Sequence, residues 1–205
     1  MRAINNNLVC DFQCSDINRN MIYPRVEMDP ECIRLVMISE APSTDFSNYF
    51  YKSISAPFFQ TTMSAFADAG FMIKDYADLT SMGIYLTTAI KCPKKDYLVS
   101  SETIKNCSVI LEKELSQFPE KKAIMCMGDF AIKAINHIYK SNTGIAPIRS
   151  GSTYKIRKEK FELNGIRFFP SYTQTGDSFN IEKSKRRMIA EDIKNALSYI
   201  QSSYE

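Results

Sequence analysis

The chain has 205 residues, of which 44% are hydrophobic and 24% are charged, and its formal net charge is +3. This is the size and composition of one globular domain, and we expect a single cytoplasmic domain over residues 1–205. No apolar run approaches the length of a membrane span, and the N-terminus holds no signal-like apolar region. The charge is too small to imply a polyanionic partner by itself.

Strand-like and helix-like segments alternate along the chain. Short apolar runs rich in β-branched residues predict buried strands over 33–39, 84–91 and 122–128. Start and stop signals predict helices over 61–70, 100–118, 129–140 and 181–201. A turn at Asn164 and Gly165 divides 153–169 into two further strands. The alternation predicts an α/β fold, namely a three-layer α/β/α sandwich around a short, mostly parallel central sheet.

In an open parallel sheet the site lies beyond the carboxyl ends of the strands. Three predicted loops meet this condition. Glu40 lies in the first loop, Lys91 and Cys92 lie in the second, and Ser171 lies in the third. We therefore expect chemistry near Glu40.

The cysteines fit no disulfide framework, because the chain has no export signal. Cys10 and Cys14 are close in sequence, and Cys92 and Cys107 come from a loop and the following helix. These four thiols suit either an iron–sulfur cluster or zinc, and unrelated thiols are an equal alternative by spacing alone. Cys126 and Cys32 read as core thiols, with Cys32 as the substitute ligand.

Three basic clusters occur at 91–95, 155–160 and 183–187. Charge runs are usually solvated faces. Their positions beside candidate loops favour a phosphate-backbone partner only modestly.

Short motifs in a fixed order carry a family resemblance. Cys10 and Cys14 are followed by MISEAP, APF, LTTAIKC, a helix-borne cysteine, MCMGDFA and FFPSY. This order resembles the iron–sulfur uracil-DNA glycosylases first known from thermophiles, and it covers nearly the whole chain. The resemblance implies a [4Fe–4S] cluster on Cys10, Cys14, Cys92 and Cys107, with zinc as the alternative. It also implies a glycosylase that acts on single- or double-stranded DNA. We expect a monomer, and a monofunctional enzyme because no lysine stands out as a Schiff-base nucleophile.

The resemblance also implies roles around a flipped base. Glu40 would stabilise positive charge on the sugar and orient a water, with Asp45 in reserve. Ala41 in the same loop would contact the base, and Phe58 would stack on it, although Phe59 makes that assignment ambiguous by one position.

Further residues would hold the DNA strand. Ser171, Arg149 and Lys91 are candidates for phosphate contacts, Lys185 and Arg186 would support the strand beyond them, and Tyr172 would fill the vacated stack.

The chain departs from the family pattern where the base is recognised. Phe169 stands at the position of the family's histidine, and Thr88 stands at that of its asparagine. Ser39 and Ser43 replace glycines of the acidic loop, and an aromatic spacer at 48–51 makes the next segment longer. These changes indicate a pocket for uracil or for a related or modified base, with the spacer as a new wall.

Two alternatives have other functions. An iron–sulfur DNA-binding protein of the same fold would have little or no glycosylase activity. A nucleotide-binding domain ranks low, because the chain has no GxGxxG or GxxxxGK run. His137, on a predicted helix, is not expected to replace the lost histidine.

Overall fold

The structure, a computed structural model, describes residues 2–202. Its centre is a five-stranded sheet in the order β4-β3-β5-β7-β6. Strands β3 (Leu35–Ser39), β4 (Ile84–Thr88), β5 (Ala123–Met127) and β7 (Ile166–Ser171) run parallel, and β6 (Phe161–Leu163) pairs antiparallel with β7. The predicted α/β fold with a mostly parallel sheet is confirmed.

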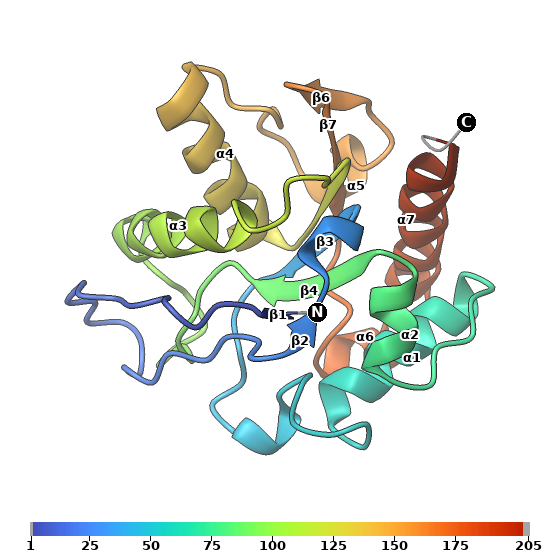
Figure 1. Ribbon diagram of the computed structural model, residues 1–205, viewed down its shortest axis with the longest axis horizontal. Coiled ribbons are helices and arrows are strands. Elements are labelled where there is room, and N and C mark those ends of the chain that lie inside the picture. The colour runs from blue at the N-terminus through green and yellow to red at the C-terminus, as the bar shows by residue number, and fades with distance from the viewer. Residues whose placement is uncertain (1, 203–205) are drawn as a thin grey trace.

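Helices cover both faces of the sheet (Figure 1). Helices α3 (Ser101–Leu115) and α4 (Asp129–Thr143) pack on one face. Helices α1 (Pro57–Asp68) and α7 (Lys183–Ser202) pack on the other, with α2 (Tyr76–Ser81) and α6 (Asp177–Ile181) beside them. The shorter elements are β1 (Arg2–Ala3), β2 (Glu27–Met28), α5 (Thr153–Ile156) and the 3-10 turns Pro30–Cys32 and Phe46–Asn48.

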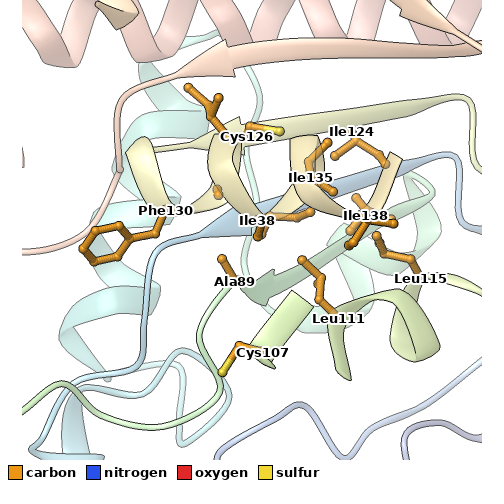
Figure 2. Close-up of a cluster of buried hydrophobic side chains, with 14 of the residues drawn as sticks. Ile38, Ala89, Cys107, Leu111, Leu115, Ile124, Cys126, Phe130, Ile135 and Ile138 are labelled. Atoms are coloured by element: carbon orange, nitrogen blue, oxygen red, sulfur yellow. The ribbon is translucent and has the colours of Figure 1, made fainter. Parts of the chain in front are cut away.

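Alternation along the strands divides the core in two. Ile38 and Ile124 join the cluster under α3 and α4, whereas Met37 and Met125 join the cluster under α1 and α7. Figure 2 shows the first cluster, with Leu111 of α3 and Ile135 of α4 pointing toward the sheet. The strands read as continuous apolar runs because both of their faces are buried.

Two predictions about the C-terminal third were wrong. Residues 153–156 form α5 instead of a strand, and the Arg157 side chain after it is fixed to Asp192 of α7 at 2.6 Å. Strand β7 continues to Ser171, because its pairing with β5 runs on to Met127.

The N-terminal segment is fastened to the sheet by polar contacts. Asn5 is buried, and its amide donates to the Pro24 carbonyl at 2.7 Å and to the Tyr85 hydroxyl at 2.8 Å. Residues 17–22 then run beside residues 91–94, with Asn18 N–H on the Pro93 carbonyl at 2.8 Å. Within residues 2–202 no helix combines the length and apolarity needed to cross a membrane.

Candidate functional site

A narrow pocket opens beyond the carboxyl ends of β3 and β4. Its cavity volume is about 30 Å³. That is well below the roughly 300–1,000 Å³ of small-molecule sites, so the aromatic wall must move apart before a ligand the size of a base can enter. Its lining comes from the ends of both strands, the loop after β3, the start of α1 and the loop after β7: Pro24, Ser39, Ala41, Pro42, Tyr49, Phe50, Tyr51, Phe58, Leu86, Thr87, Thr88, Gln174 and Thr175.

Aromatic residues of the spacer form one wall of this pocket. Phe50 packs against Tyr51 with ring centroids 4.8 Å apart and against Phe59 at 5.2 Å. The Tyr51 hydroxyl donates to the Leu86 carbonyl at 3.0 Å, which ties the spacer to β4. The expected new wall is therefore present, and Phe58 rather than Phe59 lines the pocket.

Gln174 brings a buried amide to the pocket from the loop after β7. Its Oε1 accepts from the Ser39 hydroxyl at 3.1 Å, and its Nε2 donates to the Thr62 hydroxyl at 3.4 Å. The Thr62 hydroxyl itself donates to the Phe58 carbonyl at 2.7 Å, so it must act as acceptor toward Gln174. These partners fix which end of the amide is the donor.

Glu40 lies beside the pocket and does not line it. Its Oε1 accepts from the Phe130 backbone N–H at 3.4 Å, at the amino end of α4, where the helix dipole favours a carboxylate. The Glu40 side chain packs directly against Gly128, where an added Cβ would lie 2.5 Å from Glu40 Cγ. Gly128 also has φ +103°, which side-chain-bearing residues rarely adopt, so glycine is what allows Glu40 to lie here.

Behind the pocket lies a fully buried ion pair between Lys91 and Glu114. The Lys91 ammonium also donates to the Thr88 carbonyl at 2.6 Å and to the Thr87 hydroxyl at 2.8 Å. Because Lys91 is 1% exposed and fully engaged, the predicted phosphate contact at this residue is wrong. Its actual contacts support the floor of the pocket.

The structure brings the four predicted ligand cysteines into one region. Cys14 accepts a long contact of 3.7 Å from the amide of Asn106, next to Cys107 on α3. Asp16 anchors the same segment to the start of α3, where it accepts from Ser100 N–H at 2.6 Å. Cys92 lies in the loop alongside, so two distant parts of the chain meet here.

The thiols influence one another electrostatically. Burial, followed by the charges of Cys107, Cys10 and Cys14, raises the pKa of Cys92 to about 11. The Asn20 backbone amide bonds to Cys92 and the Lys91 backbone amide bonds to Cys107, and both of these bonds favour the thiolates. Such amide-to-sulfur bonds are among the contacts that tune iron–sulfur clusters.

All six cysteines are free thiols. The described side chains include no group of three Cys, His, Asp or Glu residues already at metal-binding separation. The donor set nonetheless has the composition of a cluster site, four thiols with amides directed at two of them. Cys32 bonds to Asp29, and Cys126 lies inside the core (Figure 2), away from Cys107 in that view.

Other predicted site residues lie away from the pocket lining. Asp45 is exposed, and hydrogen bonds from the Ser47 side chain and from the Ser47 N–H, the latter at 2.9 Å, lower its pKa. Phe169 lies within β7 against Tyr199, with ring centroids 5.9 Å apart. Ser171 is fully buried and donates to Asp192 at 2.7 Å, so the predicted phosphate contact through its side chain is wrong.

The remaining basic and aromatic candidates are on the surface. Lys185 lies over the Tyr172 ring at 5.5 Å, which joins the loop after β7 to the start of α7. Arg186 pairs with Asp68, and Arg149 pairs with Glu159, which raises the pKa of both arginines. His137 lines a shallow hollow between α3 and α4, away from the pocket.

Sequence reasoning missed Tyr49 and Gln174 as individual pocket residues. The aromatic spacer was a signal for the first. For the second, the run TQTG after the predicted strand was a signal that this loop, and not Phe169, reaches the site.

Comparisons with known proteins agree with this geometry. The family model described as the uracil DNA glycosylase superfamily matches residues 27–194, which contain the pocket wall, Glu40 and two of the four cysteines. The chain is also 27% identical over 157 residues to a type-5 uracil-DNA glycosylase of Thermus thermophilus, a match that covers 72% of this chain and 69% of the relative. The resemblance to this superfamily is thereby confirmed.

Proposed function

Because this chain belongs to the uracil-DNA glycosylase superfamily, we propose that it hydrolyses the N-glycosidic bond of uracil, or of a related or modified base, flipped out of DNA. The observation that carries the proposal is the aromatic pocket beside Glu40 at the carboxyl edge of the sheet. A flipped nucleotide needs such a pocket, since the base leaves the stack and must be held.

In this proposal the base enters between Phe58 and the aromatic wall, and its sugar stays at the mouth. The glycosidic bond breaks with its electron pair on the base nitrogen, and positive charge develops on the sugar. The Glu40 carboxylate would stabilise that charge and accept a proton from the water that adds to the sugar carbon. Gly128 and the amino end of α4 would keep Glu40 in place.

Strand contacts would come from the rim. Tyr172 and Lys185 lie together at the loop after β7, where an aromatic ring could replace the flipped base and an ammonium could contact phosphate. Arg186 and Arg149 are further candidates, and each must exchange a carboxylate partner for a phosphate.

We also propose that Cys10, Cys14, Cys92 and Cys107 hold a [4Fe–4S] cluster, with zinc as the alternative metal. The cluster would supply cross-linking rather than redox chemistry, because its ligands join the N-terminal segment to the loop after β4 and to α3.

The rival function is a nucleic-acid-binding protein of the same fold with little catalysis. One observation favours it: among the described pocket-lining residues there is neither a histidine nor an asparagine. Losing one strong donor to the leaving group typically costs about 100- to 1,000-fold in rate, which leaves room for measurable catalysis.

The test is base release from end-labelled oligonucleotides by protein purified without oxygen. The oligonucleotides carry uracil, hypoxanthine, xanthine or modified cytosine, in single- and double-stranded form. We expect release from at least one, and a loss of about 100-fold or more in Glu40→Gln, with DNA binding retained. Glu162→Gln, at an exposed carboxylate on β6, is the matched control. No release from any substrate, with DNA binding intact, would support the rival.

A further inference from the structure

One polar group of a pocket-lining residue has no hydrogen-bond partner in the described part of the chain. The Tyr49 hydroxyl is inaccessible to solvent and has no hydrogen bond to any residue among 2–202, and the residue as a whole is 9% exposed. Burying a hydroxyl without a hydrogen bond is costly, so such groups are rare in native proteins. An orphaned hydroxyl in a ligand pocket indicates that the ligand supplies the missing partner.

Tyr49 is one of the residues that line the pocket, and its hydroxyl is buried there. Its ring stacks on the exposed Phe46, with centroids 5.5 Å apart, so the outer side of Tyr49 is covered. Burial and then the charges of Tyr51, Glu114 and Tyr76 raise its pKa far above the ordinary value, which keeps the phenol protonated. Tyr49 is therefore available as a neutral O–H donor.

The neighbouring tyrosine shows the contrast. The Tyr51 hydroxyl donates to the Leu86 carbonyl at 3.0 Å and accepts from the Leu86 N–H at 3.3 Å. Tyr51 thus supports the wall, whereas Tyr49, in the same spacer, keeps its donor unused. Because the Tyr51 hydroxyl is hydrogen-bonded and the Tyr49 hydroxyl is not, we infer that the two tyrosines have different roles.

Gln174 supplies a second donor to the same pocket. Its carbonyl is taken by Ser39, and the described part of the chain shows one hydrogen bond from its amide nitrogen, to Thr62. An amide nitrogen carries two donors. One N–H therefore remains for a ligand.

We propose that the Tyr49 hydroxyl determines specificity by donating to a carbonyl oxygen of the flipped base, with Gln174 as the second donor. This inference rests on the proposed function. It assigns the pocket to bases that present acceptors at that edge, such as uracil or hypoxanthine, and against cytosine and adenine, which present an amino group there. Thr88, at the position of the family's asparagine, can make one hydrogen bond but not the paired contact of an amide.

The test compares Tyr49→Phe with wild type in single-turnover release from uracil and hypoxanthine oligonucleotides. We expect release to slow by about 10- to 100-fold, because a site built to hydrogen-bond its substrate loses strongly when a partner is removed. Tyr139→Phe is the control, since Tyr139 lies on α4 against Phe168 with centroids 5.0 Å apart, outside the pocket. Its rates should match wild type.

Thermal unfolding separates binding from a structural role. Tyr49→Phe keeps the ring and removes an unsatisfied buried hydroxyl, so its Tm should equal or exceed that of wild type. A lower Tm in parallel with the lower rate would overturn the proposal, because the hydroxyl would then be structural. An unchanged rate would overturn it as well.

A separate measurement of oligonucleotide binding distinguishes failure of this inference from failure of the proposed function. Anisotropy measures affinity for oligonucleotides with uracil or cytosine at one position. If wild type releases no base but prefers uracil, and Tyr49→Phe loses the preference, the inference stands and the enzymatic proposal falls. If wild type neither releases nor prefers a base, both are wrong.

Discussion

Two regions meet at the carboxyl end of β4, the cysteine region and the pocket. They differ in how completely their buried polar groups are hydrogen-bonded. On the cysteine side, Asn5 and Asp16 bond their segments to the rest of the chain, and Glu114 accepts from Tyr85 and Thr87 as well as Lys91. On the pocket side the wall is aromatic, and the Tyr49 hydroxyl lacks a partner among the residues described. Buried polar groups that are hydrogen-bonded stabilise the fold, whereas a buried polar group without a partner is available to bind a ligand.

Substitutions in the two regions should therefore change different measurable properties. In the cysteine region, a substitution should report on folding and metal content. In the pocket, it should report on substrate and leave stability nearly unchanged. Substitutions in each region, and at the residues between them, can break this comparison or sharpen it.

The largest effect is expected at the cysteines. Cys14→Ser should lose essentially all bound metal, because a cluster needs each of its thiolates. Metal analysis and visible absorption of protein purified without oxygen measure the loss, and they also separate iron from zinc. Cys32→Ser is the control, since Cys32 is exposed and bonded to Asp29. Equal metal in both variants would remove the cysteine region from the comparison.

Lys91 lies between the two regions. Lys91→Met leaves Glu114 buried without its cation, which should cost about 3–5 kcal/mol. For a chain of this size that is roughly 6–20 °C in Tm, measured by calorimetry. The same variant releases the Thr88 carbonyl in the pocket, so base release should also change. Arg149→Met, which breaks an exposed pair with Glu159, should leave the Tm close to that of wild type. Equal losses in the two variants would contradict this assignment.

More of the fold than of the pocket could be predicted from the sequence. The strands could be predicted because buried parallel strands are continuous apolar runs, whereas the assignment of the cysteines as ligands stays a prediction. Phe169 was expected in a site loop because FFPSY resembled a family motif, but pairing with β5 carries β7 through it. The burial of Lys91 and the isolation of the Tyr49 hydroxyl depend on partners far away in sequence, so no local pattern predicts them.

Gly128 tests how Glu40 is held beside the pocket. Gly128→Ala places a Cβ against Glu40 at φ +103°, so we expect a loss of about 3 kcal/mol and a fall in base release like that of Glu40→Gln. Gly144→Ala is matched to it, since Gly144 has φ +78° but nothing within 4 Å of an added Cβ. It should cost about 1–2 kcal/mol and leave activity intact. Activity retained in Gly128→Ala would mean that Glu40 needs no such support.

Asp192 is a buried carboxylate on the pocket side and can be compared with Glu114 on the cysteine side. It accepts from Ser171, at the end of the strand that leads to Gln174, and from Arg157 at 2.6 Å. Burial raises its pKa from 3.8 to about 6, although both partners act in the opposite direction. The folded state therefore binds this proton more tightly than the unfolded state does.

The sign of the pH dependence follows. As the pH rises from about 4 to 6, this group should lower the free energy of unfolding, by about 2–3 kcal/mol in total, with no further change above 6. Urea unfolding at several pH values measures the slope, and Asp192→Asn should remove this contribution even if it lowers stability overall. Asp45→Asn should change the slope in the opposite sense, because the pKa of Asp45 is lowered and its contribution is lost as the pH falls. An unchanged slope in Asp192→Asn would mean that Arg157 and Ser171 offset the effect of burial, so that folding leaves the pKa of this carboxyl unchanged.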